Sequence, residues 1–358
     1  MVGTAFSYTI SASNIPTGFN IVGNLPPGLV FNFGTGAISG TPTQSGTWTL
    51  TIQAENSYGT GSQTLKITIT SSQNVASSWL VELSARAQME GTPNILIAGI
   101  ATSGTSPKTL LFRGIGPGLG NFGVVGYLPN PQLTLFDSTN TPITTVDSWN
   151  PNLASVFQSV GAFPLTLGSN DAAVTEILQP GGYTAQITSA NSQGGIALAE
   201  AYDLNPGDPI NRLVNISLRA PVGTGANIVI GGFVVGGNSV EKLLIRGIGP
   251  GLGTFGLVGA LAAPVLSVYD GSQNLVATIT GWGIGAPYSV GPGLDTSTGM
   301  SVIPATSSDF SQVGAFALQS GSRDCALVMG LPPGSYTAEV AGAGGSTGVA
   351  LVEIFETH

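Results

Sequence analysis

Hydrophobic and polar residues alternate regularly near the N-terminus of the chain. In GTWTLTIQAEN (46–56) apolar side chains occupy positions 48, 50, 52 and 54 and polar ones occupy positions 47, 49, 51 and 53, and TLKITIT (64–70) repeats this alternation. A period of two is the pattern of strands that bury one face. Turn-rich stretches such as LPPGL (25–29) separate the apolar segments. We therefore predict a small sandwich of about seven short strands over residues 1–73, followed by a linker at 71–78.

The remainder of the chain contains one pattern of segments twice. LLFRGIGPGLG (110–120) recurs as LLIRGIGPGLG (243–253), an offset of 133 residues. Later segments, such as VGAF at 160–163 and at 313–316, lie 153 residues apart. Because self-similarity at a fixed offset marks a repeated structural unit, we predict two homologous β domains.

The two copies are predicted to span residues 76–205 and 209–358. The change of offset from 133 to 153 places 20 additional residues in the second copy, after Trp282. We predict that they form an insertion near residues 283–312.

Composition supports short strands joined by tight turns. The chain has 358 residues with 53 Gly, 23 Pro, 42% hydrophobic and only 8% charged residues. A net charge of −9 with nine scattered basic residues excludes the footprint of a nucleic-acid or anionic-membrane binder. No stretch of eighteen apolar residues and no signal peptide pattern occur. We expect the natural chain to begin upstream of Met1.

A family resemblance follows from the residues of the N-terminal segment. Leu25, Pro26, Gly28, Leu29 and the segment TGAISGTPT (35–43) resemble the immunoglobulin-like (cadherin-like) repeats of large bacterial surface and secreted proteins. The resemblance implies a tandem spacer module. The paired acidic motifs of true cadherins are absent, so calcium is kept only as a minor alternative and no cofactor is predicted.

The two copies are similar to glycine-rich tandem domains of very large exported proteins of environmental bacteria, for which no activity is established. The segments that carry this similarity are LLIRGIGPGLG (243–253), GSRDCAL (321–327) and the C-terminal PGSYTAEVAGAGGSTGVALVEIFE (333–356). The predicted fold class is thus all-β: an immunoglobulin-like sandwich followed by two homologous β-sandwich or jelly-roll-like domains.

The glycine-rich loop at 114–120 raises the question of phosphate binding. A dinucleotide fingerprint needs glycines at GxGxxG spacing with a helix after the loop. Here Leu119 occupies the third glycine position, and Leu252 does so in the second copy. The sequence that follows has no helical pattern. We interpret both loops as structural turns, with a ligand cradle as the alternative.

Several charged residues occur in both copies. The arginines are Arg86 with Arg219 and Arg113 with Arg246, and the acids are Asp171 with Asp324, Glu200 with Glu353, and Asp137 with Asp270. In a chain this poor in charge, recurrent charges favour buried structural ion pairs. Calcium binding and paired-carboxylate catalysis remain alternatives. Asp137 and Asp270 begin ordinary hairpin turns.

A few other side chains are candidates for chemistry. Trp282 and Tyr288 at the insertion, with Trp149 in the first copy, form a possible sugar-stacking surface, although a packing role is the favoured interpretation. Cys325 is interpreted as a small core residue, and the terminal His358 as part of a tail.

These patterns predict a non-enzymatic structural or adhesive segment of an exported bacterial protein, at the cell surface or outside the cell. Its expected partners are a surface protein, a glycan or a second copy of itself, without nucleic acid or membrane insertion. The alternatives are a carbohydrate-binding module and a fragment of a secreted hydrolase.

Overall fold

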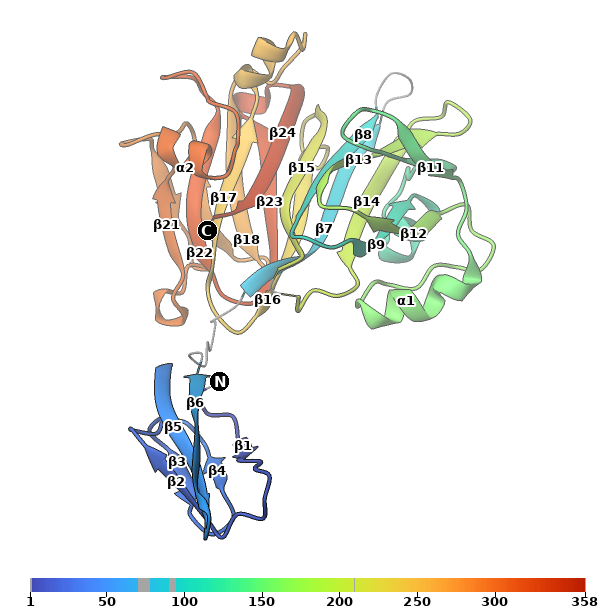
Figure 1. Ribbon diagram of the computed structural model, residues 1–358. Coiled ribbons are helices and arrows are strands. Elements are labelled where there is room, and N and C mark those ends of the chain that lie inside the picture. The colour runs from blue at the N-terminus through green and yellow to red at the C-terminus, as the bar shows by residue number, and fades with distance from the viewer. Residues whose placement is uncertain (1, 70–77, 90–94, 209, 358) are drawn as a thin grey trace. The chain divides into compact units, whose positions relative to one another are not determined.

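The computed structural model describes residues 2–69, 78–89, 95–208 and 210–357, and strands dominate it (Figure 1). The all-β prediction is therefore confirmed. The chain divides into two compact units, Met1–Ala76 and Ser77–His358. The predicted linker, except for Ser78, and the terminal His358 lie outside the described residues.

The N-terminal unit contains two small antiparallel sheets. One has the order β1-β4-β3 and the other β2-β5-β6. The strands are β1 (Phe6–Thr9), β2 (Gly18–Val22), β3 (Leu29–Asn32), β4 (Ala37–Gly40), β5 (Gly46–Asn56) and β6 (Gly59–Ile69). Leu50 and Ile52 of β5 pack with Ile67 and Ile69 of β6 in one buried cluster, as the alternation predicts.

The larger unit begins with strands from the first copy. They are β7 (Ser78–Met89), β8 (Leu96–Ser103), β9 (Lys108–Ile115), β10 (Pro131–Phe136), β11 (Pro142–Val146), β12 (Ala172–Leu178), β13 (Gly181–Ser189) and β14 (Gly195–Asp203). The corresponding segments of the second copy form β15 (Arg212–Val222), β16 (Val229–Gly237), β17 (Glu241–Ile248), β18 (Pro264–Asp270), β19 (Leu275–Ile279), β22 (Cys325–Leu331), β23 (Gly334–Gly342) and β24 (Gly348–Glu356).

These strands pair in two continuous antiparallel rows, here called sheet I and sheet II. Sheet I has the order β12-β9-β14-β7-β16-β23-β18-β19-β20. Sheet II has the order β11-β10-β13-β8-β15-β24-β17-β22-β21. The additional strands β20 (Tyr288–Val290) and β21 (Ser301–Pro304) come from the insertion, and each extends one sheet. The main hydrophobic core draws on both copies.

The two copies meet edge to edge in both sheets. Strand β7 pairs with β16 in sheet I, where Arg86 lies opposite Ile230, and β8 pairs with β15 in sheet II, where Ile97 lies opposite Arg219. Arg219 and Ile230 are the second-copy equivalents of Arg86 and Ile97, at the offset of 133 residues, so each copy contributes the same two strands to the contact. The contact is therefore isologous, like that of a symmetric dimer. The predicted boundary between the copies, at 205–209, therefore lies inside one compact unit.

Candidate functional site: glycine loops and buried ion pairs

Each glycine-rich loop forms a short 3-10 helix that binds a carboxylate of the chain itself. The helices are η1 (Pro117–Phe122) and η3 (Pro250–Phe255), after β9 and β17. In the second copy the backbone N–H groups of Gly249 and Gly251 donate to Asp324 Oδ1 at 2.8 and 3.0 Å. Ser322 Oγ donates to Oδ2 of this fully buried aspartate at 2.7 Å. The loop is thus a nest for an oxyanion, and the aspartate already occupies it.

The first copy repeats this geometry. Gly116 and Gly118 donate to Asp171 Oδ1 at 2.8 and 3.0 Å, and Ser169 donates to Oδ2 at 2.7 Å. The N–H groups that a phosphate would need are therefore satisfied internally in both loops.

Replacing Asp324 with asparagine should destabilise the larger unit by about 1–3 kcal/mol, because a neutral amide accepts hydrogen bonds less strongly and leaves a buried donor poorly paired. Chemical denaturation of the full chain measures this change. Equal stability of the variant and the parent would mean that the loop does not depend on the carboxylate.

A buried ion pair lies beside each loop. Arg113 of β9 faces Glu200 of β14, with Nε 2.8 Å from Oε2, and its Nη1 donates to the carbonyl oxygen of Phe163 at 2.8 Å. In the second copy Arg246 Nε donates to Glu353 Oε2 at 2.8 Å and Nη1 donates to the Phe316 carbonyl at 2.7 Å.

Both guanidinium groups are fully buried among aromatic rings. The Arg113 Cζ atom lies 4.2 Å from the ring centroid of Phe163, and the Arg246 Cζ atom lies 4.3 Å from that of Phe316. Because both guanidinium groups are fully buried and each lies close to a carboxylate and to at least two rings, these arginines present no free charge to a ligand.

The structure thus assigns the recurrent acids to different tasks. Glu200 and Glu353 pair with Arg113 and Arg246, whereas Asp171 and Asp324 hold the loops. Arg86 and Arg219 form no ion pair within 4.0 Å with another described residue. They lie on the outer faces of the two sheets, where the copies meet.

Electrostatics differ between the copies. Burial raises the pKa of Glu200 and of Glu353, against the opposing effect of the paired arginines. In the first copy burial, with the nearby Glu200 charge, also raises the pKa of Glu82 to about 7. At the corresponding position the second copy has the neutral Asn215.

Sequence reasoning missed Glu82, and it missed Glu339 of β23. Each acid has a neutral amide at the matching position of the other copy, Asn215 and Gln186. A search for recurrent charges passes over such positions, whereas a search for differences between the copies finds them.

The raised pKa of Glu82 predicts a pH dependence of stability. Because its folded pKa exceeds the unfolded value, the folded chain binds more protons between about pH 4.5 and 7, so the free energy of unfolding falls as pH rises through this window. In the Glu82→Gln variant the decrease in the free energy of unfolding over this pH window should be smaller by about 1–2 kcal/mol, a figure reduced to allow for the partial exposure of Glu82. Denaturation at pH 5 and 7.5 tests this, and an unchanged pH dependence in the variant would refute it.

The aromatic candidates lie mainly in packed surroundings. Trp282 is half-buried, donates from Nε1 to Ser322 Oγ at 3.1 Å and packs on Phe310 at 5.1 Å between ring centroids. Trp149 is half-buried against Phe157 at 5.5 Å. Tyr288 is exposed on strand β20.

The remaining chemical candidates are placed as follows. Cys325 is fully buried, its Sγ lies 3.2 Å from the carbonyl oxygen of Pro264, and burial raises its thiol pKa to about 11. Asp137 and Asp270 accept backbone hydrogen bonds in their own hairpin turns. Among the described residues no group of three or more His, Cys, Asp or Glu is suited to a metal ion. Within the same residues no helix is long and apolar enough to span a membrane.

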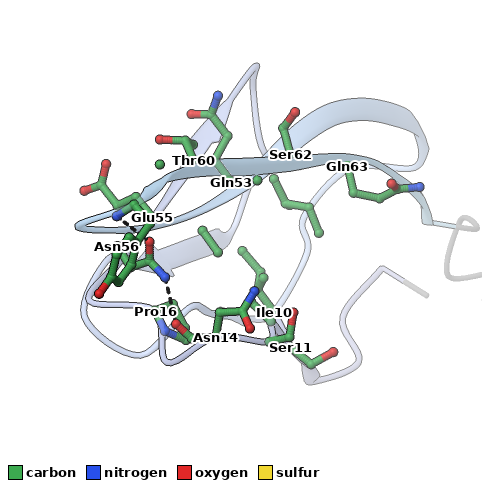
Figure 2. A pocket seen from close by; sticks show the side chains of 17 residues that line it. Ile10, Ser11, Asn14, Pro16, Gln53, Glu55, Asn56, Thr60, Ser62 and Gln63 are labelled. Carbon is green, nitrogen blue, oxygen red and sulfur yellow. Dashed lines mark hydrogen bonds between the residues drawn. The ribbon is translucent and has the colours of Figure 1, made fainter.

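The N-terminal unit has a polar groove of about 750 Å³ between residues 10–16 and the β5–β6 hairpin (Figure 2). Asn56 Nδ2 donates to the carbonyl oxygen of Asn14 at 2.7 Å across it, and this contact supports the left-handed backbone of Asn14 and Ile15. Glu55 is the one charged residue among the described residues that line the groove.

Comparisons with known proteins concern mainly this N-terminal unit. Residues 1–70 match the family described as Putative Ig domain, which confirms the immunoglobulin-like prediction for that segment. No curated protein matches the chain.

Two solved structures show weak similarity. A DUF4785 family protein from Legionella pneumophila subsp. pneumophila str. Philadelphia 1 is 11% identical over 78% of this chain and 88% of that chain, with a TM-score of 0.17. A structure named BspA_C_mut is 7% identical over 88% of this chain and 84% of that chain, with a TM-score of 0.14. These scores are too low to support an argument about fold.

Proposed function

We propose that the chain is a non-enzymatic structural and adhesive segment of an exported bacterial protein, which assembles at the cell surface through its sheet edges. The observation that carries this proposal is the edge-to-edge pairing of the two copies in both sheets. The immunoglobulin-like N-terminal segment and the similarity of both copies to glycine-rich tandem domains of exported proteins support it. The buried arginines and loop aspartates are engaged in structural contacts, which argues against a catalytic role.

The outer edges of the larger unit supply a route to self-association. At the end formed by the first copy, Ile143 on β11 is 41% exposed and Ile177 on β12 is 71% exposed. At the other end, Val290 on β20 and Ile303 on β21 are 52% and 56% exposed. Open edge strands with apolar side chains pair readily with other chains.

Sedimentation velocity of the full chain across a range of concentrations tests this proposal. Self-association should increase with concentration and should weaken in Ile177→Lys and Ile303→Lys, because a charged residue blocks edge pairing. The matched control is Ile284→Lys, since Ile284 is 97% exposed but lies in a turn. A monomer at every concentration, or equal loss in the control, would contradict the proposal, as would hydrolysis of generic ester, peptide or glycoside substrates.

A further inference from the structure

A groove of about 620 Å³ crosses the junction between the two copies on sheet II. Its apolar lining includes Ile97, Leu257, Phe316 and Phe255, whose side chain is 65% exposed. Gln186, Ser217 and Arg219 are among its polar lining, and none of the described residues that line it is acidic. The volume suits a small organic ligand.

Among the described residues that line this groove, Arg219 is the one that carries a charge. Its side chain is exposed, and it makes no hydrogen bond or ion pair with the described residues. It stands in a row across three neighbouring strands, because Ile97 of β8 lies opposite both Gln186 of β13 and Arg219 of β15. The polar residue at the other end of this row, beyond Ile97, is therefore the neutral amide Gln186.

The matching row on sheet I differs in one respect. Ile230 of β16 lies opposite both Arg86 of β7 and Glu339 of β23. Arg86 lowers the pKa of the Glu339 carboxyl, although burial raises it more, so the two charges interact. Arg86 thus has an acidic residue in its row, whereas the described row of Arg219 contains none.

We propose that the sheet II groove binds a small amphipathic carboxylate, in which a carboxylate is joined to one aromatic or branched apolar group. The guanidinium fork of Arg219 pairs with the carboxylate, since its planar donors match that geometry. The apolar group packs on Phe255 and Leu257. A ligand of this class supplies the negative charge that Glu339 provides in the other row.

N-acetyl-phenylalanine is a suitable probe, and its amide is the matched neutral control. Calorimetric titration of the full chain should give at least tenfold weaker binding of the amide. Arg219→Ala should remove this preference for the acid, and Gln186→Glu should weaken acid binding about tenfold because it restores the arrangement of the other row. Arg86→Ala should bind like the parent chain.

Three outcomes would overturn the assignment: equal binding of acid and amide, no binding of the acid at a concentration of about 10 mM, where a ligand with a millimolar dissociation constant would be mostly bound, or equal loss in Arg86→Ala and Arg219→Ala. Thermal unfolding of each variant verifies that it is folded, and both arginines lie on outer faces where substitution is tolerated. The edge variants Ile177→Lys and Ile303→Lys should retain acid binding, so this test is independent of the self-association test.

Discussion

The Arg246→Ala variant is expected to lose about 3–5 kcal/mol of stability in the larger unit, because it leaves the buried Glu353 carboxylate without its partner. The same substitution removes the Nη1 group that donates a hydrogen bond to the Phe316 carbonyl oxygen, so this oxygen loses its donor. Lysine should rescue only part of the loss, since it lacks the planar fork that contacts the carboxylate and the carbonyl together. Chemical denaturation monitored by tryptophan fluorescence measures the change, because Trp282 packs on Phe310, whose ring centroid lies 5.0 Å from Arg246 Cζ.

Two further variants separate the loss of a partner from a general loss of packing. Arg219→Ala removes an exposed guanidinium from the same unit and should change stability by less than about 0.5 kcal/mol. The double variant Arg246→Met with Glu353→Leu should recover most of the stability, since an apolar pair avoids the unpaired buried charge. If Arg246→Ala melts like Arg219→Ala, the ion pair is not a structural requirement.

The Gly249→Ala variant should lower the free energy of unfolding by at least about 3 kcal/mol, which is the upper end of the usual cost of overpacking a well-packed site. A Cβ atom at this position would overlap the carbonyl oxygen of Leu261, which is backbone and cannot rotate away. Relief of this overlap requires movement of the loop that holds Gly249 N–H against Asp324. Gly116 meets the Leu128 carbonyl oxygen in the same way, so Gly116→Ala should have a similar effect.

Gly253→Ala is the matched control within the same loop. Apart from the adjacent residues and the backbone of its own helix, no described atom lies within 4 Å of a Cβ built at Gly253, and the residue is exposed. Alanine should therefore be neutral or stabilise slightly, by up to about 1 kcal/mol, through the unfolded chain. Equal unfolding midpoints for the Gly249 and Gly253 variants would mean that close backbone approach does not explain the loop geometry that the two copies share.

The β character of the chain and its immunoglobulin-like N-terminal segment can be predicted from the amino-acid sequence alone. Alternation in residues 46–56 identifies a strand with one buried face because successive side chains of a strand point to opposite sides. The offset of 133 residues between Arg113 and Arg246 identified equivalent loops, because the conformation of a turn depends mainly on a few consecutive residues. These features depend on neighbours along the chain.

Which carboxylate pairs with each arginine depends on the three-dimensional arrangement of the strands. Sequence recurrence offered Asp171 and Glu200 equally as partners for Arg113, and the register of β9 against β14 selected Glu200. Asp171 instead accepts the loop N–H groups of Gly116 and Gly118. Such a choice rests on distances of a few ångströms between residues far apart in the chain, which no local pattern encodes.

The junction of the copies was likewise decided in three dimensions. The repeat boundaries predicted two successive domains, but pairing of β7 with β16 and of β8 with β15 makes their sheets continuous. The backbone groups of an edge strand can form hydrogen bonds with many other strands, so the alternation within a strand does not predict which strand will pair with it. That pairing also brings Gln186 and Arg219, from different copies, into one row, because Ile97 lies between them and opposite both.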